Sequence, residues 1–333
     1  MVVLAVAPAL FLAPTTPASA RGGLPAVEPP AGSPAGSAAG VEVAFGSLFG
    51  PVRSGGSTAP WAFAPRVEEP EPEPEPEPLP ESGFAASAVA AAVAAAGLVQ
   101  GMDLRVTVWD RELGESASAG AADEPTYTAS LSKVVLAIDV VDRRRTEGLV
   151  VTARDLDLLR RALGPSDDSA MNALWSRFGG AEAASRVSAR LGLTGTRDPR
   201  DPSQWGEMRV SAEDGVRLYD HVLDLPAADR DLILGALRAA PPTARDGFAQ
   251  DFGLLAASVG LQAGQVAVKQ GWMCCFERRY YLHSAGVVGA EARFVVALLS
   301  IQPRAGGWER ARAGLTSIGE AVAATLAQAA PAD

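Results

Sequence analysis

A serine and a lysine three residues apart stand just before a markedly apolar run of the chain. They are Ser130 and Lys133, and the run is Val134–Ile138. Side chains at positions i and i+3 of a helix are neighbours, so the amine can reach the hydroxyl. A serine hydroxyl attacks a carbonyl only when a base removes its proton, and a lysine with a lowered pKa can be that base. The pair indicates nucleophilic catalysis, although a helix-capping serine and a solvated lysine have the same spacing.

A second polar cluster, Ser166-Asp167-Asp168, also opens a predicted helix. Ser166 could pass a proton to a departing nitrogen, and Asp168 could bind an amide of a substrate. A Ser-Asp pair is equally a good helix cap, so the cluster alone decides nothing.

A third segment, Lys269-Gln270-Gly271, follows apolar residues typical of a strand. Lys269 could supply positive charge to a substrate carboxylate and to Ser166. Gly271 would let a substrate backbone come close, and the strand edge could pair with an extended substrate. The alternative is a lysine that protects an edge strand from aggregation.

The elements that must position these residues follow from the hydropathy pattern. Strands are predicted over 103–110, 115–119, 266–269, 280–287 and 293–300. Helices are predicted over 85–99, 130–145, 152–162, 169–178, 181–191, 211–223, 227–239 and 308–327. This order predicts an α+β fold, in which terminal helices flank a five-stranded antiparallel sheet and an all-helical subdomain is inserted.

Three regions divide the chain. Residues 1–20 form an apolar stretch that ends in Ala-Ser-Ala and is typical of a secretory signal, although a basic start is missing. Residues 21–82 are rich in Pro, Gly and Glu and predict an extended, disordered spacer. Residues 83–333 form the expected hydrolase domain. The apolar stretch is shorter than the ~20 residues of a membrane span, so we expect none.

The composition limits the function classes. Hydrophobic residues make up 48% of the chain, which allows a sizeable core. The net charge is −10, but residues 68–81 contain seven Glu and no basic residue, so the rest carries −3. Because basic and aromatic residues are not interleaved, nucleic acid is not an expected partner.

Metal and redox chemistry have little support in the sequence. With two histidines and the adjacent Cys274 and Cys275, no metal-ligand spacing is present. We expect the two cysteines to serve as small apolar residues, one of them buried, rather than as a redox pair. A strained disulfide between these neighbours is the alternative. His283 lies on a predicted strand, where it could touch Lys269, but a structural histidine is the favoured interpretation.

Taken in order, the three segments resemble the signatures of the serine β-lactamase and penicillin-binding-protein superfamily, class A β-lactamases most closely. Those signatures are Ser-x-x-Lys, Ser-Asp-Asn and Lys-Thr-Gly. The resemblance covers about residues 85–327 and is strongest over 166–180. It implies that Ser130 is the acylated nucleophile, Lys133 its base or proton relay, Ser166 the proton shuttle and Lys269 the anchor of a substrate carboxylate.

The resemblance also implies an oxyanion hole and a substrate-binding strand. Backbone N–H groups of Ser130 and of Trp272 or Met273 would stabilise the oxyanion. Gln270, Gly271 and Trp272 would line the substrate site.

Three departures from the family pattern bear on activity. Asp168 replaces Asn, so an ionised side chain there only accepts hydrogen bonds. Gln270 replaces Thr or Ser and reshapes the carboxylate pocket. The expected Glu-x-x-x-Asn of the omega loop is missing. Weak substitutes for the glutamate, which activates the deacylating water, are Asp198, Asp201 and Glu207.

These observations predict a secreted serine hydrolase that acts outside the cytoplasm, on the cell-wall side. It would form a Ser130 acyl-enzyme with β-lactams or related cell-wall peptides and release it slowly. The alternatives are a D-Ala-D-Ala carboxypeptidase, which is a penicillin-binding protein, and a catalytically inactive wall-binding module. We expect no cofactor, no metal, no stable membrane span and a monomer.

Overall fold

The computed structural model describes residues 83–257 and 266–329. The predicted signal segment and spacer, residues 1–82, lie outside the described residues. Within residues 83–257 and 266–329, no helix combines the length and the apolar composition that a bilayer crossing requires.

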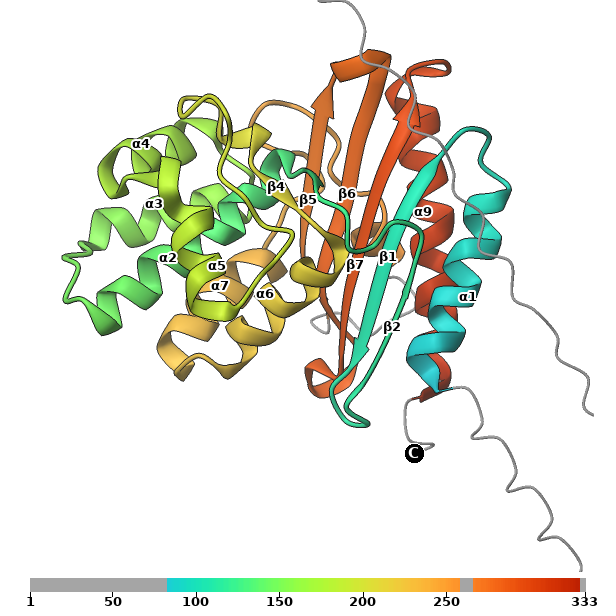
Figure 1. Ribbon diagram of the computed structural model, residues 1–333, viewed down its shortest axis with the longest axis horizontal. Coiled ribbons are helices and arrows are strands. Elements are labelled where there is room, and N and C mark those ends of the chain that lie inside the picture. Colours follow the sequence, from blue (N-terminus) through green and yellow to red (C-terminus); the bar gives the residue numbers. More distant parts are fainter. Residues whose placement is uncertain (1–82, 258–265, 330–333) are drawn as a thin grey trace, which may run out of the picture. The chain divides into compact units, whose positions relative to one another are not determined.

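A five-stranded antiparallel sheet forms the centre of the described domain (Figure 1). Its order is β2-β1-β7-β6-β5. The bounds are β1 Asp103–Asp110, β2 Glu115–Ala119, β5 Ala267–Cys274, β6 Arg279–Val288 and β7 Phe294–Pro303. The central strand β7 and its neighbour β6 are almost wholly buried because helices cover both faces, which explains their largely apolar sequences. The predicted α+β class and sheet are confirmed.

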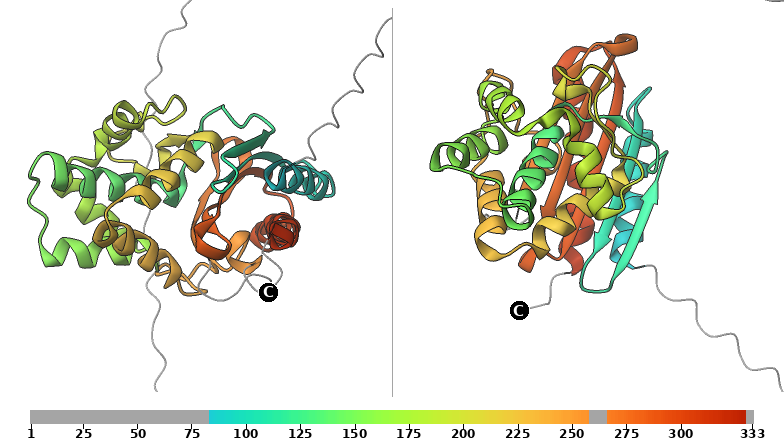
Figure 2. Two further views of the ribbon diagram at one scale, coloured as in Figure 1. Left: turned by 90° about the horizontal axis from the view of Figure 1, so that it is seen from below. Right: turned by 60° about the vertical axis from the view of Figure 1, so that its left-hand side comes forward.

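The first and the last α-helix of the described residues cover one face of the sheet. They are α1, Phe84–Gly97, and α9, Gly307–Leu326. Figure 2 shows them side by side. They pack through small and branched apolar residues, which include Ala88, Ala92 and Ile318. The prediction of flanking terminal helices is confirmed.

Six further helices form a separate layer against the other face (Figures 1 and 2), whereas the short α8, Leu254–Ala257, packs against α9. The six are α2 Ser132–Thr146, α3 Ala153–Leu163, α4 Asp168–Phe178, α5 Ala183–Leu191, α6 Ala212–Asp224 and α7 Ala227–Arg238. At their centre lies α2, whose residues 132–142 are all buried. Such all-round burial explains why the apolar residues Val134–Ile138 follow one another without a polar face. It also fixes the residues at its N-terminus firmly in space.

The structure contains more strand than was predicted, in β5 and in a second, small sheet. Strand β5 continues five residues beyond its predicted end at Lys269, so Gln270, Gly271 and Trp272 lie on it. A second, small sheet was not predicted. It pairs β3, Thr126–Tyr127, with β4, Arg209–Val210, and so joins the chain before Ser130 to the segment before α6.

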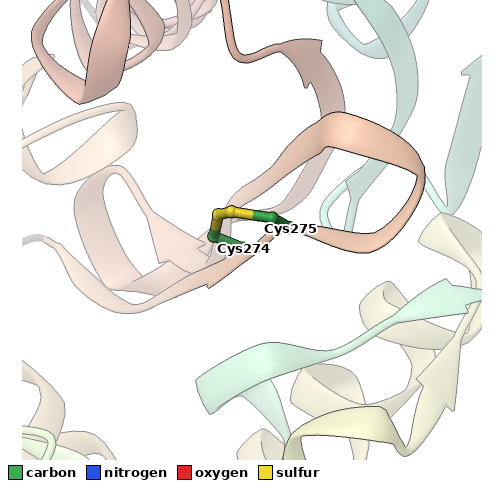
Figure 3. The surroundings of a disulfide bond; sticks show 2 residues. All are labelled: Cys274 and Cys275. Carbon is green, nitrogen blue, oxygen red and sulfur yellow. A yellow bond between two sulfur atoms is a disulfide. The ribbon is translucent and has the colours of Figure 1, made fainter.

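The two cysteines differ from their prediction. Cys274 ends β5, and a disulfide joins it to Cys275 across a cis peptide bond (Figure 3). Both residues are exposed, because they stand where the chain leaves the sheet to turn into β6. The expectation of two small apolar residues, one buried, was wrong.

His283 is fully buried and serves as a structural link, as the favoured interpretation held. Its Nε2 lies 2.8 Å from the carbonyl oxygen of Tyr127, and its Nδ1 accepts the Ser300 N–H at 3.3 Å. On β6 it faces Gly271 of β5, whereas Lys269 faces Ala285, so the imidazole does not contact Lys269. It fixes the segment that leads to Ser130.

Acid is expected to destabilise the fold through His283. Burial lowers the pKa of this imidazole from 6.5 to about 4. The unfolded chain therefore binds the proton first as the pH falls, and stability decreases between these two values. We expect a loss of about 2 kcal/mol in the free energy of unfolding between pH 7 and pH 5.

Urea unfolding at a series of pH values tests this. A His283→Gln variant can keep one donor and one acceptor but does not titrate in this range, so its slope should be flatter. Equal slopes for the two proteins would contradict the assignment.

Candidate active site

Ser130 lies in a short 3-10 helix, Ala129–Leu131, that runs directly into α2. Ala129 has a φ of 46°, an uncommon value for a residue other than glycine. Such strained backbone persists only where the surroundings hold it. Here Thr128 N–H donates to the Met208 carbonyl at 2.8 Å. No side chain caps the first N–H groups of this helix, so they can face an oxyanion.

Lys133 brings the first two motifs together. Its Nζ lies 3.0 Å from Ser130 Oγ and 2.6 Å from Asp168 Oδ1. It also lies 3.0 Å from Ser166 Oγ and 2.9 Å from the Ser166 carbonyl oxygen. An ammonium has only three N–H donors for these four oxygens. The lysine side chain is fully buried, so it is not the solvated helical residue of the alternative interpretation.

Ser166 links the two lysines. Its Oγ lies 2.9 Å from Lys269 Nζ, which also donates to the Gln270 carbonyl oxygen at 2.9 Å. Ser166 adopts a φ of 55°, which turns the chain so that both its hydroxyl and its carbonyl face Lys133. Hydrogen-bond contacts therefore run unbroken from Ser130 through Lys133 and Ser166 to Lys269.

The helix α4 that follows is anchored independently of this chain of contacts. Asp167 is its N-cap and accepts the N–H groups of Ser169 and Ala170. Arg161 bonds the same carboxylate at 2.5 Å. Burial alone would raise the pKa of Asp167, but the Arg161 contact and the two N–H groups outweigh it and lower that pKa. Asp167 is thus a structural support, whereas Asp168 faces the site.

The whole sequence contains only two lysines, Lys133 and Lys269, against 27 arginines. An arginine stays protonated in proteins, whereas a lysine can release its proton when it is buried. Both positions at which this protein uses lysine are buried and touch Ser166. The choice of lysine there is explained if a proton must move.

Burial and charge set the pKa values of both amines. Burial lowers the pKa of Lys133, and the negative charge of Asp168 offsets part of this shift. Burial lowers the pKa of Lys269 well below its usual value, and the charge of Lys133 lowers it further. Each lysine is therefore closer to a proton acceptor than an exposed lysine is.

A pocket of about 430 Å³ opens over these groups. Its lining residues are Ala129, Asp168, Asn172, Ser203, Gln204, Trp205, Gly206, Trp272 and Met273. A larger pocket of about 590 Å³ lies between α3 and α7 and contains none of the motif side chains. The smaller pocket is the candidate substrate site because Asp168, which bonds Lys133, and Trp272 line it.

Gly271 lets the edge strand β5 come close to the nucleophile. A Cβ atom there would lie 2.9 Å from the Thr128 carbonyl oxygen and 3.5 Å from Ala129 Cβ. Only glycine fits without moving one of these segments. β5 is an edge strand of the described sheet, and it contacts the 3-10 helix that carries Ser130.

The neighbours of Gly271 have different environments. Gln270 is buried, and its Nε2 donates to the Phe252 carbonyl at 2.5 Å, away from Lys269 and the pocket lining. Trp272 lines the pocket, and its ring lies 5.5 Å from Lys269 Nζ. The Gln270 side chain is therefore not brought together with the other motif residues, whereas Trp272 is.

Sequence reasoning missed Asp246, which follows α7. It accepts the Trp272 Nε1–H at 3.2 Å, and its charge acts on both lysines. The only local signal is an Asp-Gly turn at 246–247, which indicates geometry rather than chemistry. Asn172 and Trp205 were also missed as site residues.

No carboxylate of the segment 197–208 reaches Lys133 in the described structure; the indole of Trp205 lies there instead. Its ring centroid is 4.8 Å from Lys133 Nζ, and its Nε1–H donates to Asn172 Oδ1 at 2.8 Å. Asp198 is bonded to Ser185, and Asp201 accepts the N–H and hydroxyl of Ser203.

Glu207 lies in the 3-10 helix Trp205–Glu207 and, like the two aspartates, forms no ion pair with Lys133 among the described residues. Among these same residues, no three His, Cys, Asp or Glu side chains gather closely enough to hold a metal ion.

Solved structures share this fold at low sequence identity. A β-lactamase from Chitinophaga pinensis superposes with a TM-score of 0.57 and 15% identity over 73% of this chain and 98% of its own. A class A β-lactamase from Mycobacterium abscessus superposes with a TM-score of 0.55 and 18% identity. This match covers 72% of this chain and 99% of its own. The fold is that of class A β-lactamases.

Curated relatives are more similar in sequence. "Putative lipoprotein LppW" of Mycobacterium tuberculosis and of Mycobacterium bovis is 36% identical over 207 residues. This match covers 61% of the present chain and 64% of the length of those relatives.

A family model described as "Beta-lactamase enzyme family" matches residues 145–326, a little over half of the chain. The match includes Ser166 and Lys269, and it begins after Lys133. Model, fold and motif order agree, and the chain belongs to the β-lactamase enzyme family.

Proposed function

We propose that this protein is a serine hydrolase that cleaves amide bonds through an acyl-enzyme on Ser130. Its substrates are β-lactams or the chemically related D-Ala-D-Ala ends of peptidoglycan stem peptides. The observation that carries the proposal is the 3.0 Å contact between Ser130 Oγ and Lys133 Nζ, buried and continued through Ser166 to Lys269.

The proposed acylation follows these contacts. The neutral amine of Lys133 takes the proton of Ser130 as Oγ attacks the carbonyl carbon. The first N–H groups of the helix at 129–131 and an N–H of Trp272 or Met273 stabilise the oxyanion. Ser166 then donates its proton to the departing nitrogen and recovers one from a lysine. Lys269 also attracts the substrate carboxylate.

The proposed site of action is outside the cytoplasm. The apolar segment 1–20 resembles a secretory leader, and the relatives at 36% identity carry the name lipoprotein. Cell-wall substrates are found on that side of the membrane.

Turnover separates the two enzymatic candidates. A chromogenic cephalosporin should be hydrolysed by the wild type, and Ser130→Ala should reduce this to the level of buffer. Release of D-Ala from a stem peptide, with no cephalosporin turnover, would instead favour the carboxypeptidase. If neither reaction occurred, the hydrolase proposal would be overturned and the inactive module would stand.

A further inference from the structure

Asp168 is the one carboxylate in the described structure that forms an ion pair with Lys133. It does so at 2.6 Å from the first turn of α4. Its side chain is 53% exposed and lines the pocket, whereas Lys133 is fully buried. The carboxylate thus lies within two hydrogen-bond lengths of Ser130 Oγ and is itself open to solvent.

Asn172 adds a second polar group beside Asp168. The two residues stand four apart on α4, so they share a helix face, and both line the pocket. An indole N–H can only donate, so the Trp205 bond fixes Oδ1 of Asn172 as its acceptor. The Nδ2 group therefore points elsewhere and has no protein acceptor among the described residues.

We propose that Asp168, aided by Asn172, activates the water that hydrolyses the Ser130 acyl-enzyme. This inference rests on the proposed function, because it needs the acyl-enzyme to form. The residue that activates the water would thus lie on α4. The segment 197–208 places no carboxylate at Lys133 in the described structure. The side chain of Trp205 occupies that position and orients Asn172.

The step balances as an ester hydrolysis. The Asp168 carboxylate accepts a proton from water while the water oxygen bonds to the ester carbonyl carbon. The bond from that carbon to Ser130 Oγ then breaks, and Oγ regains a proton through Lys133. The products are a free carboxylic acid and the serine hydroxyl.

The test is the lifetime of the Ser130 adduct with a penicillin, followed by intact mass. In Asp168→Asn, which keeps the shape but removes the base, the adduct should persist at least about 100-fold longer than in the wild type. Formation of the adduct should not slow, because loss of the Asp168 charge favours the neutral amine of Lys133. A merely structural defect would slow both steps.

Matched variants test the alternative bases. Asp201→Asn, the same substitution at an exposed carboxylate bonded only to Ser203, should keep the wild-type lifetime, as should Glu207→Gln. The proposal is overturned if either of these prolongs the adduct instead. It is also overturned if the wild-type adduct decays no faster than that of Asp168→Asn. If the wild type forms no adduct with any penicillin tried, the proposed function itself fails, and the role of Asp168 fails with it.

Discussion

Replacing Lys133 by methionine is expected to slow acylation of Ser130 by about a thousandfold or more. The amine is the only basic group placed at hydrogen-bond distance from Ser130 Oγ in the described structure, and general-base catalysis contributes about 10²- to 10⁴-fold. Methionine is unbranched and of similar length, so the buried cavity stays filled. The rate of adduct formation, measured by mass at several penicillin concentrations, checks this.

A suitable control removes one positive charge from elsewhere on the protein. Arg238 is exposed at the C-terminal end of α7 and does not line the candidate substrate pocket. Arg238→Met should acylate at the wild-type rate. Rapid acylation of Lys133→Met would show that another group is the base.

Replacing Lys269 by methionine should weaken catalysis and yet stabilise the fold. The lysine is fully buried, and its amine lies near that of Lys133, with Ser166 as their shared partner. Burying an ionisable amine costs free energy, and its replacement by an apolar side chain of similar volume is often stabilising. We expect a gain of about 1–2 kcal/mol in the free energy of unfolding.

The same variant loses a charged donor to the substrate carboxylate, so kcat/KM should fall about 10- to 100-fold. Lys269→Arg, which keeps the charge, should recover part of the substrate affinity. Thermal unfolding and steady-state kinetics on the same preparation give both values. A loss of stability with unchanged kinetics would mark Lys269 as a structural residue only.

Much of the fold follows from the sequence because most elements have clear periodicity or composition. The helix at 308–327 and the strand at 103–110 were predicted within one residue of their observed bounds. The strand signal was predicted to end at Lys269, whereas β5 continues to Cys274, with Gly271 in close approach to Thr128. Tertiary contact decided its conformation, and local propensity did not.

The candidate site divides in the same way. Ser130, Lys133, Ser166 and Lys269 could be proposed from their types and order, and the structure places them in contact. Trp205 and Asp246 could not, because their positions depend on how two long loops fold back on the pocket. Gln270 was predicted to line the substrate site from its place in the third motif. Its side chain instead donates to the Phe252 carbonyl oxygen and does not line the pocket.

The most direct test of the central claim is the intact mass of the protein during incubation with a penicillin, followed by peptide mapping. The account predicts an increase equal to the mass of the penicillin, located on Ser130 and absent in Ser130→Ala. It also predicts that this adduct disappears with time in the wild type. An unchanged mass with several β-lactams, or an adduct at any residue other than Ser130, would contradict it.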